Sequence, residues 1–280
     1  MRVCLLGSGA ADGWPNAFCA CPACQSARRD HVLRGQTSAL IDDVMLVDCG
    51  PQAPFQATRL GESLTGVRVL LYTHAHSDHF GPEALLYRSW TDPKPLQVLG
   101  PRPVIQACEP WLAPTSSVEL VEMRAGQTVA LAGYEVTALP AAHRVFEAGD
   151  SFLFDITGPD GARILWASDT GALPSTWFAQ VTGAHYDLVF LEHTFGEHDL
   201  GGNHLNADGF AHTVAELRAC SAVDDRTQVI AVHLGHHNGN ERLLRERLAV
   251  SGAHAGTDGL SVFAGVSSRS ERSRKSTLES

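Results

Sequence analysis

One short segment constrains this chain more than any other: Thr73-His74-Ala75-His76-Ser77-Asp78-His79. It directly follows the apolar run 67–72, which predicts a buried β-strand. Side chains two residues apart point to the same side of an extended chain, so the first two histidines face one way. The aspartate and the third histidine follow where the chain must bend. Imidazoles and a carboxylate at this spacing suit zinc or a similar first-row divalent ion. The segment therefore predicts a metal site at the end of a strand, in preference to a solvated polar loop.

Three further donors occupy the same position relative to later strand-like runs. His143, Asp169 and His233 each come just after, or end, an apolar run. Each of them alone could be an ordinary loop residue. Four ligands in one segment cannot complete the shells of two metals, however, and this repeated layout is what convergence on one edge of a sheet would produce. We therefore expect all three to join the first segment in a two-metal site.

Strand-like runs bounded by glycine and proline occur throughout the chain, with helical periodicity between them. The expected strands are 3–6, 38–41, 44–47, 67–72, 134–139, 152–156, 163–167, 187–191, 228–233 and 259–263. The expected helices are 52–60, 82–90, 101–111, 174–181, 207–220 and 241–250, with Asn206 as an N-cap. This order predicts an α/β protein in which two sheets pack face to face with helices outside. We expect one domain over residues 1–265 and, because residues 266–280 are polar, charged and without periodicity, a disordered tail.

Composition narrows the classes of partner. No apolar run approaches the roughly 18 residues that a membrane span needs, so no membrane association is expected. The short apolar run after Met1 is too brief for a secretion signal, which makes a cytoplasmic location the expectation. A formal net charge of −10 disfavours a broad surface for the phosphates of an extended nucleic acid. A small anionic ligand stays compatible with this charge, because bound cations would dominate the local field.

The ordered set of histidines and aspartates resembles the metallo-β-lactamase fold superfamily, over about residues 1–265. The resemblance implies an αββα four-layer sandwich with the metals at one edge. It also implies the ligand sets: His74, His76 and His143 for one metal, Asp78, His79 and His233 for the other, and Asp169 as the bridge. Asp48 resembles the family's strand-end aspartate, which would accept the free N–H of a ligating histidine. One departure is that Gly81 comes two residues after His79, where many members have three, so we expect the loop to exit differently.

Cys19, Cys21 and Cys24 supply three thiolates within six residues. They suit a closed structural zinc site, which needs a fourth ligand, better than three exposed thiols. His236 is the expected fourth ligand and His237 the alternative. The same cysteine pattern resembles the phosphoribosyl cyclic phosphodiesterase branch of the superfamily, which implies a site formed by the three cysteines and His236. Such a site contributes folding free energy and takes no part in turnover.

The resemblance to that branch also points to His204, whose counterpart acts near the phosphate as a general acid or an anion clamp. His204 and Asp78 are the expected catalytic residues, and the alternative for His204 is a packing or capping role. We expect two catalytic divalent metals, zinc or alternatively manganese, in addition to the structural zinc. Two such cations share a hydroxide that attacks a phosphodiester.

The expected substrate is a small cyclic or ribose-linked phosphate, and a homodimer is compatible with the sequence. The alternative functions are a metallohydrolase of a thioester, lactone or lactam, and a non-catalytic metal-binding protein of a biosynthetic cluster.

Overall fold

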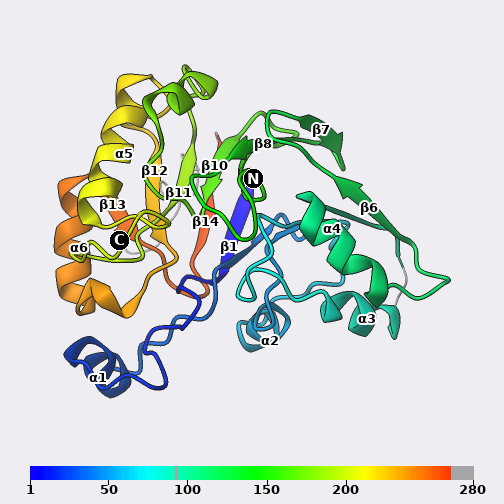
Figure 1. Cartoon of the computed structure of the whole chain (residues 1–280), viewed down its shortest axis with the longest axis horizontal. Coiled ribbons are helices and arrows are strands. Elements are labelled where there is room, and N and C mark those ends of the chain that lie inside the picture. Colours follow the sequence, from blue (N-terminus) through cyan, green and yellow to red (C-terminus); the bar gives the residue numbers. More distant parts are fainter. Residues whose placement is uncertain (92–93, 266–280) are drawn as a thin grey trace, which may run out of the picture.

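Two seven-stranded sheets pack against one another in the computed structural model, which describes residues 1–91 and 94–265 (Figure 1). The first sheet contains, in spatial order, β14 (Ser261–Phe263), β1 (Arg2–Gly7), β2 (Ser38–Ile41), β3 (Met45–Val47), β4 (Val69–Leu71), β5 (Leu96–Gly100) and β6 (Val118–Glu122). The second contains β13 (Ala253–Ala255), β12 (Gln228–Val232), β11 (Leu188–Glu192), β10 (Arg163–Ala167), β9 (Phe152–Thr157), β8 (Tyr134–Pro140) and β7 (Thr128–Leu131). The predicted tail, residues 266–280, lies outside the described residues.

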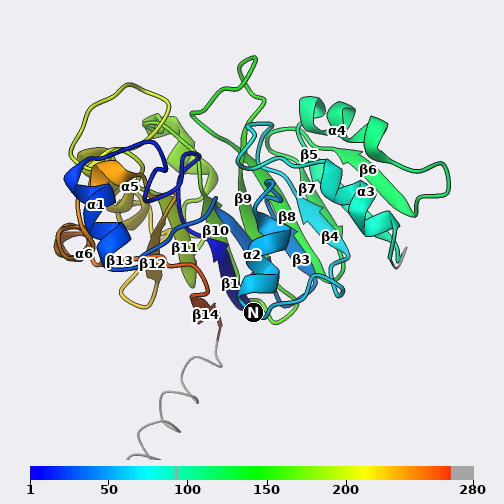
Figure 2. The same ribbon diagram turned by 90° about the horizontal axis from the view of Figure 1, so that it is seen from below.

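Helices cover the outer face of each sheet, as the two orthogonal views show (Figure 2). On the first sheet lie α2 (Ala53–Arg59), α3 (Glu83–Ser89) and α4 (Arg102–Cys108), which continues into the 3-10 turn η1 (Glu109–Trp111). On the second lie α5 (Ala207–Ala219), α6 (Glu241–Val250) and the 3-10 helix η2 (Ser175–Gln180). A further helix, α1 (Pro22–Arg29), contacts the 3-10 turn η3 (His236–Asn238). The αββα sandwich expected from the sequence is confirmed.

The layers follow from the alternation of side chains along buried strands. On β10, Ile164 and Trp166 enter the core between the sheets, whereas Leu165 and Ala167 pack under the helices of the second sheet. A strand buried on both faces is apolar at every position, which is why such strands appear in the sequence as uninterrupted apolar runs. No helix in the described part of the chain is both long and apolar enough to cross a membrane.

The sequence prediction left out four strands and one α-helix that the described residues form. Strands β6 and β7 are partly exposed, so their sequences lack a clear apolar signal. Strands β5 and β13 were also left out. Helix α1 is polar and buries only Ala23, Cys24 and Ala27, which is too little for an apolar stripe. Asn206 caps α5 as expected, accepting the backbone N–H of Gly209.

Candidate metal centre

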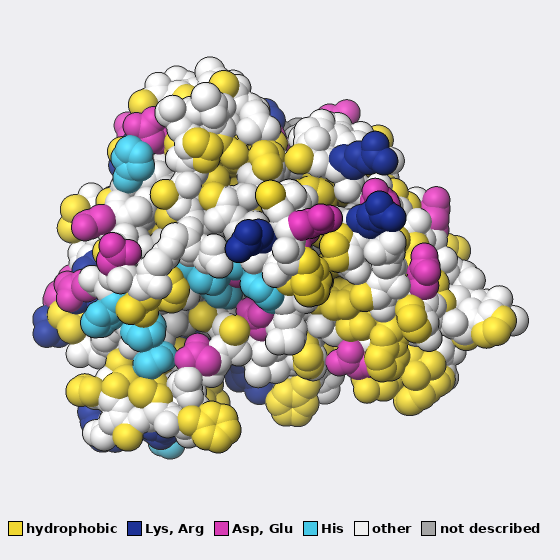
Figure 3. Space-filling model, viewed as in Figure 1, with side chains coloured by type: hydrophobic (Ala, Val, Ile, Leu, Met, Phe, Trp, Pro, Cys, Tyr) yellow, Lys and Arg dark blue, Asp and Glu magenta, His cyan; other side chains and the backbone are white. Residues whose placement is uncertain are grey.

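The predicted donors meet at one edge of the sandwich because their strands end there. β3 to β6 run parallel, as do β10 to β13, so the carboxyl ends of each set lie together. Asp48 follows β3 and His233 follows β12, and both residues adopt the left-handed region, with φ of 55° and 52°. This conformation is costly for a residue with a side chain and concentrates at functional sites. Figure 3 shows histidine side chains gathered near the centre of the corresponding face of the molecule.

The first group of donors contains His74, His76, His143 and Asp169. Nδ1 of His76 lies 3.0 Å from Nε2 of His74 and 3.0 Å from Nε2 of His143. Oδ2 of Asp169 lies 3.7 Å from the same nitrogen of His74 and 3.9 Å from that of His143. Three imidazole nitrogens and a carboxylate oxygen thus point at one place, as the ligands of a divalent cation do.

The second group contains Asp78, His79 and His233. Oδ2 of Asp78 lies 3.1 Å from Nε2 of His79 and 3.3 Å from Nε2 of His233. The other carboxylate oxygen of Asp169, Oδ1, faces this group, at 3.1 Å and 3.5 Å from the same two nitrogens. Asp169 therefore presents one oxygen to each group, which is the geometry of a carboxylate that bridges two metals.

The second ring nitrogen is engaged away from the centre in four of the candidate ligands, His74, His79, His143 and His233. Nδ1 of His79 lies 2.7 Å from Asp48, and Nδ1 of His143 lies 2.9 Å from the carbonyl oxygen of Asn203. Since both partners accept, each of these rings in its neutral, metal-binding form would carry its proton on Nδ1 and turn the Nε2 lone pair inward. Within the described residues, Nε2 of His79 and Oδ1 of Asp169 are buried without a conventional hydrogen bond. Buried orphaned donors of this type fit a cation between them.

Two threonines connect buried carboxylates to the remaining ligands. Thr73 Oγ1 donates to Asp48 and so accepts the Nδ1 proton of His74, at 2.9 Å. Thr194 Oγ1 donates to Glu192, at 2.6 Å, and can accept the Nδ1 proton of His233, at 2.8 Å. A carboxylate and a threonine thus orient histidines on each side of the centre.

The charges at the centre are set by burial and by close opposite charges. Burial raises the pKa of Asp169, but the facing rings of His233 and His79 outweigh it and hold that pKa well below its usual range. The same balance lowers the pKa of Asp78, through His79 and His233. Burial lowers the pKa of His74, and the neighbouring His79 lowers it further. The centre therefore offers ionised carboxylates and a neutral imidazole, the forms in which these groups bind metals.

His204 lies against both groups. Its ring stacks on that of His233, with centroids 5.1 Å apart and planes 14° apart, and Nδ1 lies 3.0 Å from Glu192. Although burial lowers the pKa of His204, the charge of Glu192 and its hydrogen bond raise it to about 9. With Nδ1 engaged, Nε2 has no hydrogen-bond partner among the residues that the structure describes. His204 is also close enough to Asp169 and His233 to join a metal group with them.

Glu192 was not singled out as a site residue from the sequence. Its buried carboxylate accepts the backbone N–H of Thr170 and of Leu205 as well as bonding Thr194 and His204. A signal for it does exist: a glutamate ends the otherwise apolar strand β11. The ends of apolar strands carry the other candidate residues too.

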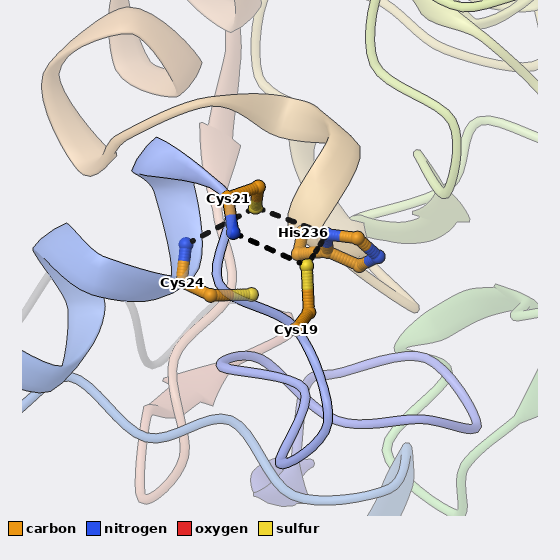
Figure 4. Close-up of side chains that lie close together, drawn as sticks. All are labelled: Cys19, Cys21, Cys24 and His236. Carbon is orange, nitrogen blue, oxygen red and sulfur yellow. Dashed lines mark hydrogen bonds between the residues drawn. The ribbon is translucent and has the colours of Figure 1, made fainter.

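The cysteine cluster forms a separate group at the N-terminus of α1 (Figure 4). Cys19, Cys21, Cys24 and His236 point toward one another, with Nδ1 of His236 3.7 Å from the sulfur of Cys19 and 3.4 Å from that of Cys21. Burial raises the pKa of Cys21, but the backbone N–H of Cys24 and the ring of His236 lower it to about 6. A thiolate at neutral pH suits zinc, and three sulfurs with one imidazole make a closed set.

Among the remaining histidines, His237 does not join the cysteine group and lies against His198, with ring centroids 5.3 Å apart. His193 is buried against Phe210, and His212 is exposed on α5. The exit of the first segment is held by Gly81, whose N–H donates to the carbonyl oxygen of Cys49.

A cavity of about 400 Å³ lies between α2 and α3, and its lining in the described structure includes no candidate ligand. The converging donors, and not the size of a cavity, therefore locate the site.

Comparison with known proteins agrees with this arrangement. The family model described as the beta-lactamase superfamily domain matches residues 44–233. The ribonuclease Z of Mycobacterium marinum is 30% identical over 156 residues, which are 47% of this chain and 54% of that enzyme, so the chain spans about half the length of this curated relative. The crystal structure of Zn(2+)-bound PqqB from Methylobacterium extorquens has a TM-score of 0.75 at 19% identity, and covers 94% of this chain and 100% of that one. A diphosphatase from the PhnP family has a TM-score of 0.71 at 21% identity, with 94% and 98% covered.

Proposed function

This chain belongs to the beta-lactamase superfamily, and on that premise we propose that it is a metal-dependent hydrolase of a small phosphodiester. The observation that carries the proposal is Asp169, whose two oxygens face two separate donor groups. Among similar proteins, a ribonuclease Z and a diphosphatase are both named for cleaving phosphate esters or anhydrides, which supports a phosphorus centre as the target.

In this proposal His74, His76 and His143 would hold one divalent cation and Asp78, His79 and His233 would hold the other. Asp169 would supply one carboxylate oxygen to each. When bound, two such cations activate water and stabilise the charge that develops on a phosphodiester. Zinc fits the imidazole-rich donor set, and manganese is the alternative. The cysteine group with His236 holds a third, structural zinc.

His204 supplies the proton in this scheme. Glu192 engages its Nδ1 and raises its pKa to about 9, so the ring is protonated at neutral pH and also carries a proton on Nε2, which no described residue engages. A proton donor at this atom suits the leaving oxygen of a phosphodiester, since proton transfer by a positioned side chain contributes typically 10²–10⁴-fold. A protonated ring also attracts the anionic substrate.

The acidic chain supports a small phosphate as the substrate over an extended nucleic acid. Hydrolysis of a thioester, lactone or lactam is the second candidate, because a two-metal centre also polarises a carbonyl.

The test is a substrate panel of bis(4-nitrophenyl) phosphate, a ribose cyclic phosphate, a thioester, a lactone and a lactam, combined with elemental analysis. We expect about three metal ions per chain and turnover of the phosphodiesters. We also expect His204→Ala to lower phosphodiester turnover at least 100-fold with the metal content unchanged. Turnover confined to the acyl substrates, or one metal ion or none, contradicts the proposal. No turnover of any substrate would favour a non-catalytic metal-binding protein.

A further inference from the structure

The loop that follows His143 has a fixed backbone. Residues 141–151 connect β8 to β9, and the carboxylate of Asp150 within this loop is only 4% exposed. It accepts the backbone N–H groups of Val145 at 3.1 Å, Phe146 at 2.6 Å and Glu147 at 2.9 Å. Three bonds to one buried carboxylate hold the loop in a single conformation.

Two side chains of this fixed loop are directed away from the protein core. Phe146 is 70% exposed. Arg144 is exposed and has no hydrogen bond or ion pair with any residue that the structure describes. A single exposed phenylalanine is ordinary on a protein surface. What distinguishes this pair is its place, since Arg144 is the residue next to a candidate metal ligand and its Cα is about 3.8 Å from that of His143.

A second loop lies on the other side of His143, whose Nδ1 donates to the carbonyl oxygen of Asn203 at 2.9 Å. The ring of Phe195, in the same second loop, packs edge-on against His204, with centroids 5.4 Å apart. The two loops therefore flank the donors of the metal centre. A basic side chain lies beside the histidines at the centre of this face (Figure 3).

We propose that Arg144 and Phe146 recognise the part of the substrate that does not react, an inference that rests on the proposed function. The guanidinium binds an anionic phosphate oxygen, for which its planar set of donors is suited. The ring stacks on a planar aromatic group attached to the phosphate through a sugar, which is the chemistry of a nucleotide. The substrate class is thus a phosphodiester that carries a nucleobase, as opposed to a sugar phosphate without one.

The test compares two ligands that differ by a nucleobase, adenosine 5′-monophosphate and ribose 5-phosphate. Their affinities for the full-length, zinc-loaded protein are measured by titration calorimetry. We expect the nucleotide to bind roughly 5- to 100-fold more tightly, as one stacked base allows. Phe146→Ala should remove this preference and Phe146→Trp should retain it. Phe55→Ala is the matched control, because Phe55 is also 70% exposed but lies on α2.

The role of Arg144 has its own result. Arg144→Ala should weaken both ligands by the same factor, about tenfold, because both carry the phosphate, whereas Arg245→Ala on α6 should weaken neither. Equal affinity of the wild-type protein for the two ligands, or an unchanged preference in Phe146→Ala, overturns the inference. Because the readout is binding, this outcome can occur in a protein that hydrolyses phosphodiesters. Conversely, the preference can be present in a protein that hydrolyses none, so the two failures are distinguishable.

Discussion

Replacing Glu192 by glutamine tests whether this buried carboxylate sets the protonation of His204. The carboxylate lies 3.0 Å from Nδ1 of His204, and its charge is the main cause of the raised pKa of that ring, about 9. Glutamine keeps the size of the side chain and removes the charge. The pKa of His204 should then fall from about 9 toward the usual histidine value of about 6.5, a change worth up to about 3.4 kcal/mol.

Two measurements follow this change. In the metal-free protein, NMR titration of the His204 ring should give a pKa near 9 for the wild type and a value lower by up to about 2.5 units for Glu192→Gln. In the zinc-loaded protein, the basic limb of the pH profile for the proposed phosphodiester hydrolysis should shift to lower pH. With pKa values of 9 and 6.5, the protonated fraction of His204 at pH 8 drops roughly 30-fold, but at pH 6 it changes by less than about a third.

The ratio of activities at pH 8 and pH 6 within one variant is the decisive quantity. Glu192 also accepts bonds from Thr170, Thr194 and Leu205, so glutamine disturbs packing as well, and a ratio cancels a loss that is common to both pH values. Because Thr194 connects Glu192 to His233, the metal content of the variant is measured as a control for loss of metal binding. The reasoning is refuted if the basic limb of the pH profile and the pKa of His204 measured by NMR are both the same in the variant as in the wild type.

The same ion pair has a consequence for stability. The pKa of His204 is higher in the folded chain than in the unfolded chain. The pair therefore stabilises the fold fully below about pH 6.5 and loses this contribution as the pH rises through about 9.

Three other changes have defined outcomes. Asp169→Asn should lower the affinity for the catalytic metals at least tenfold while leaving the structural zinc in place. Elemental analysis after dialysis against a weak chelator measures this, and retention of all three ions argues against a bridging carboxylate. Thr194→Val removes the hydroxyl that bonds His233 and should weaken metal binding by about 10- to 100-fold, which competition with a fluorescent zinc chelator measures. An unchanged affinity contradicts the orienting role. Cys24→Ser should remove one zinc per chain and lower the Tm measured by calorimetry by roughly 10 °C, with the catalytic metals retained. Loss of the catalytic metals with the Tm of the wild type unchanged would mean that the cysteine group is not structural.

Much of the fold could be predicted from the sequence because its central strands are short, apolar and ended by turn residues. β2 (Ser38–Ile41) and β10 (Arg163–Ala167) coincide with their predicted limits, since each is buried throughout or nearly so. Where burial is partial, as in β6, or where a helix is polar, as in α1, the apolar pattern fails and the element was not foreseen. The homodimer remains a prediction.

The sequence by itself determined which metal-binding side chains the chain offers, because ligand type belongs to single residues and the end of an apolar strand is a local signal. The tertiary structure decided how those residues divide into two donor groups. It gave each oxygen of Asp169 its own donor group and turned Nδ1 of His143 toward Asn203, 60 residues further along the chain. It also placed Glu192 against His204. Such contacts depend on how loops cross the edge of two stacked sheets, and the spacing of residues along the chain does not predict how those loops run.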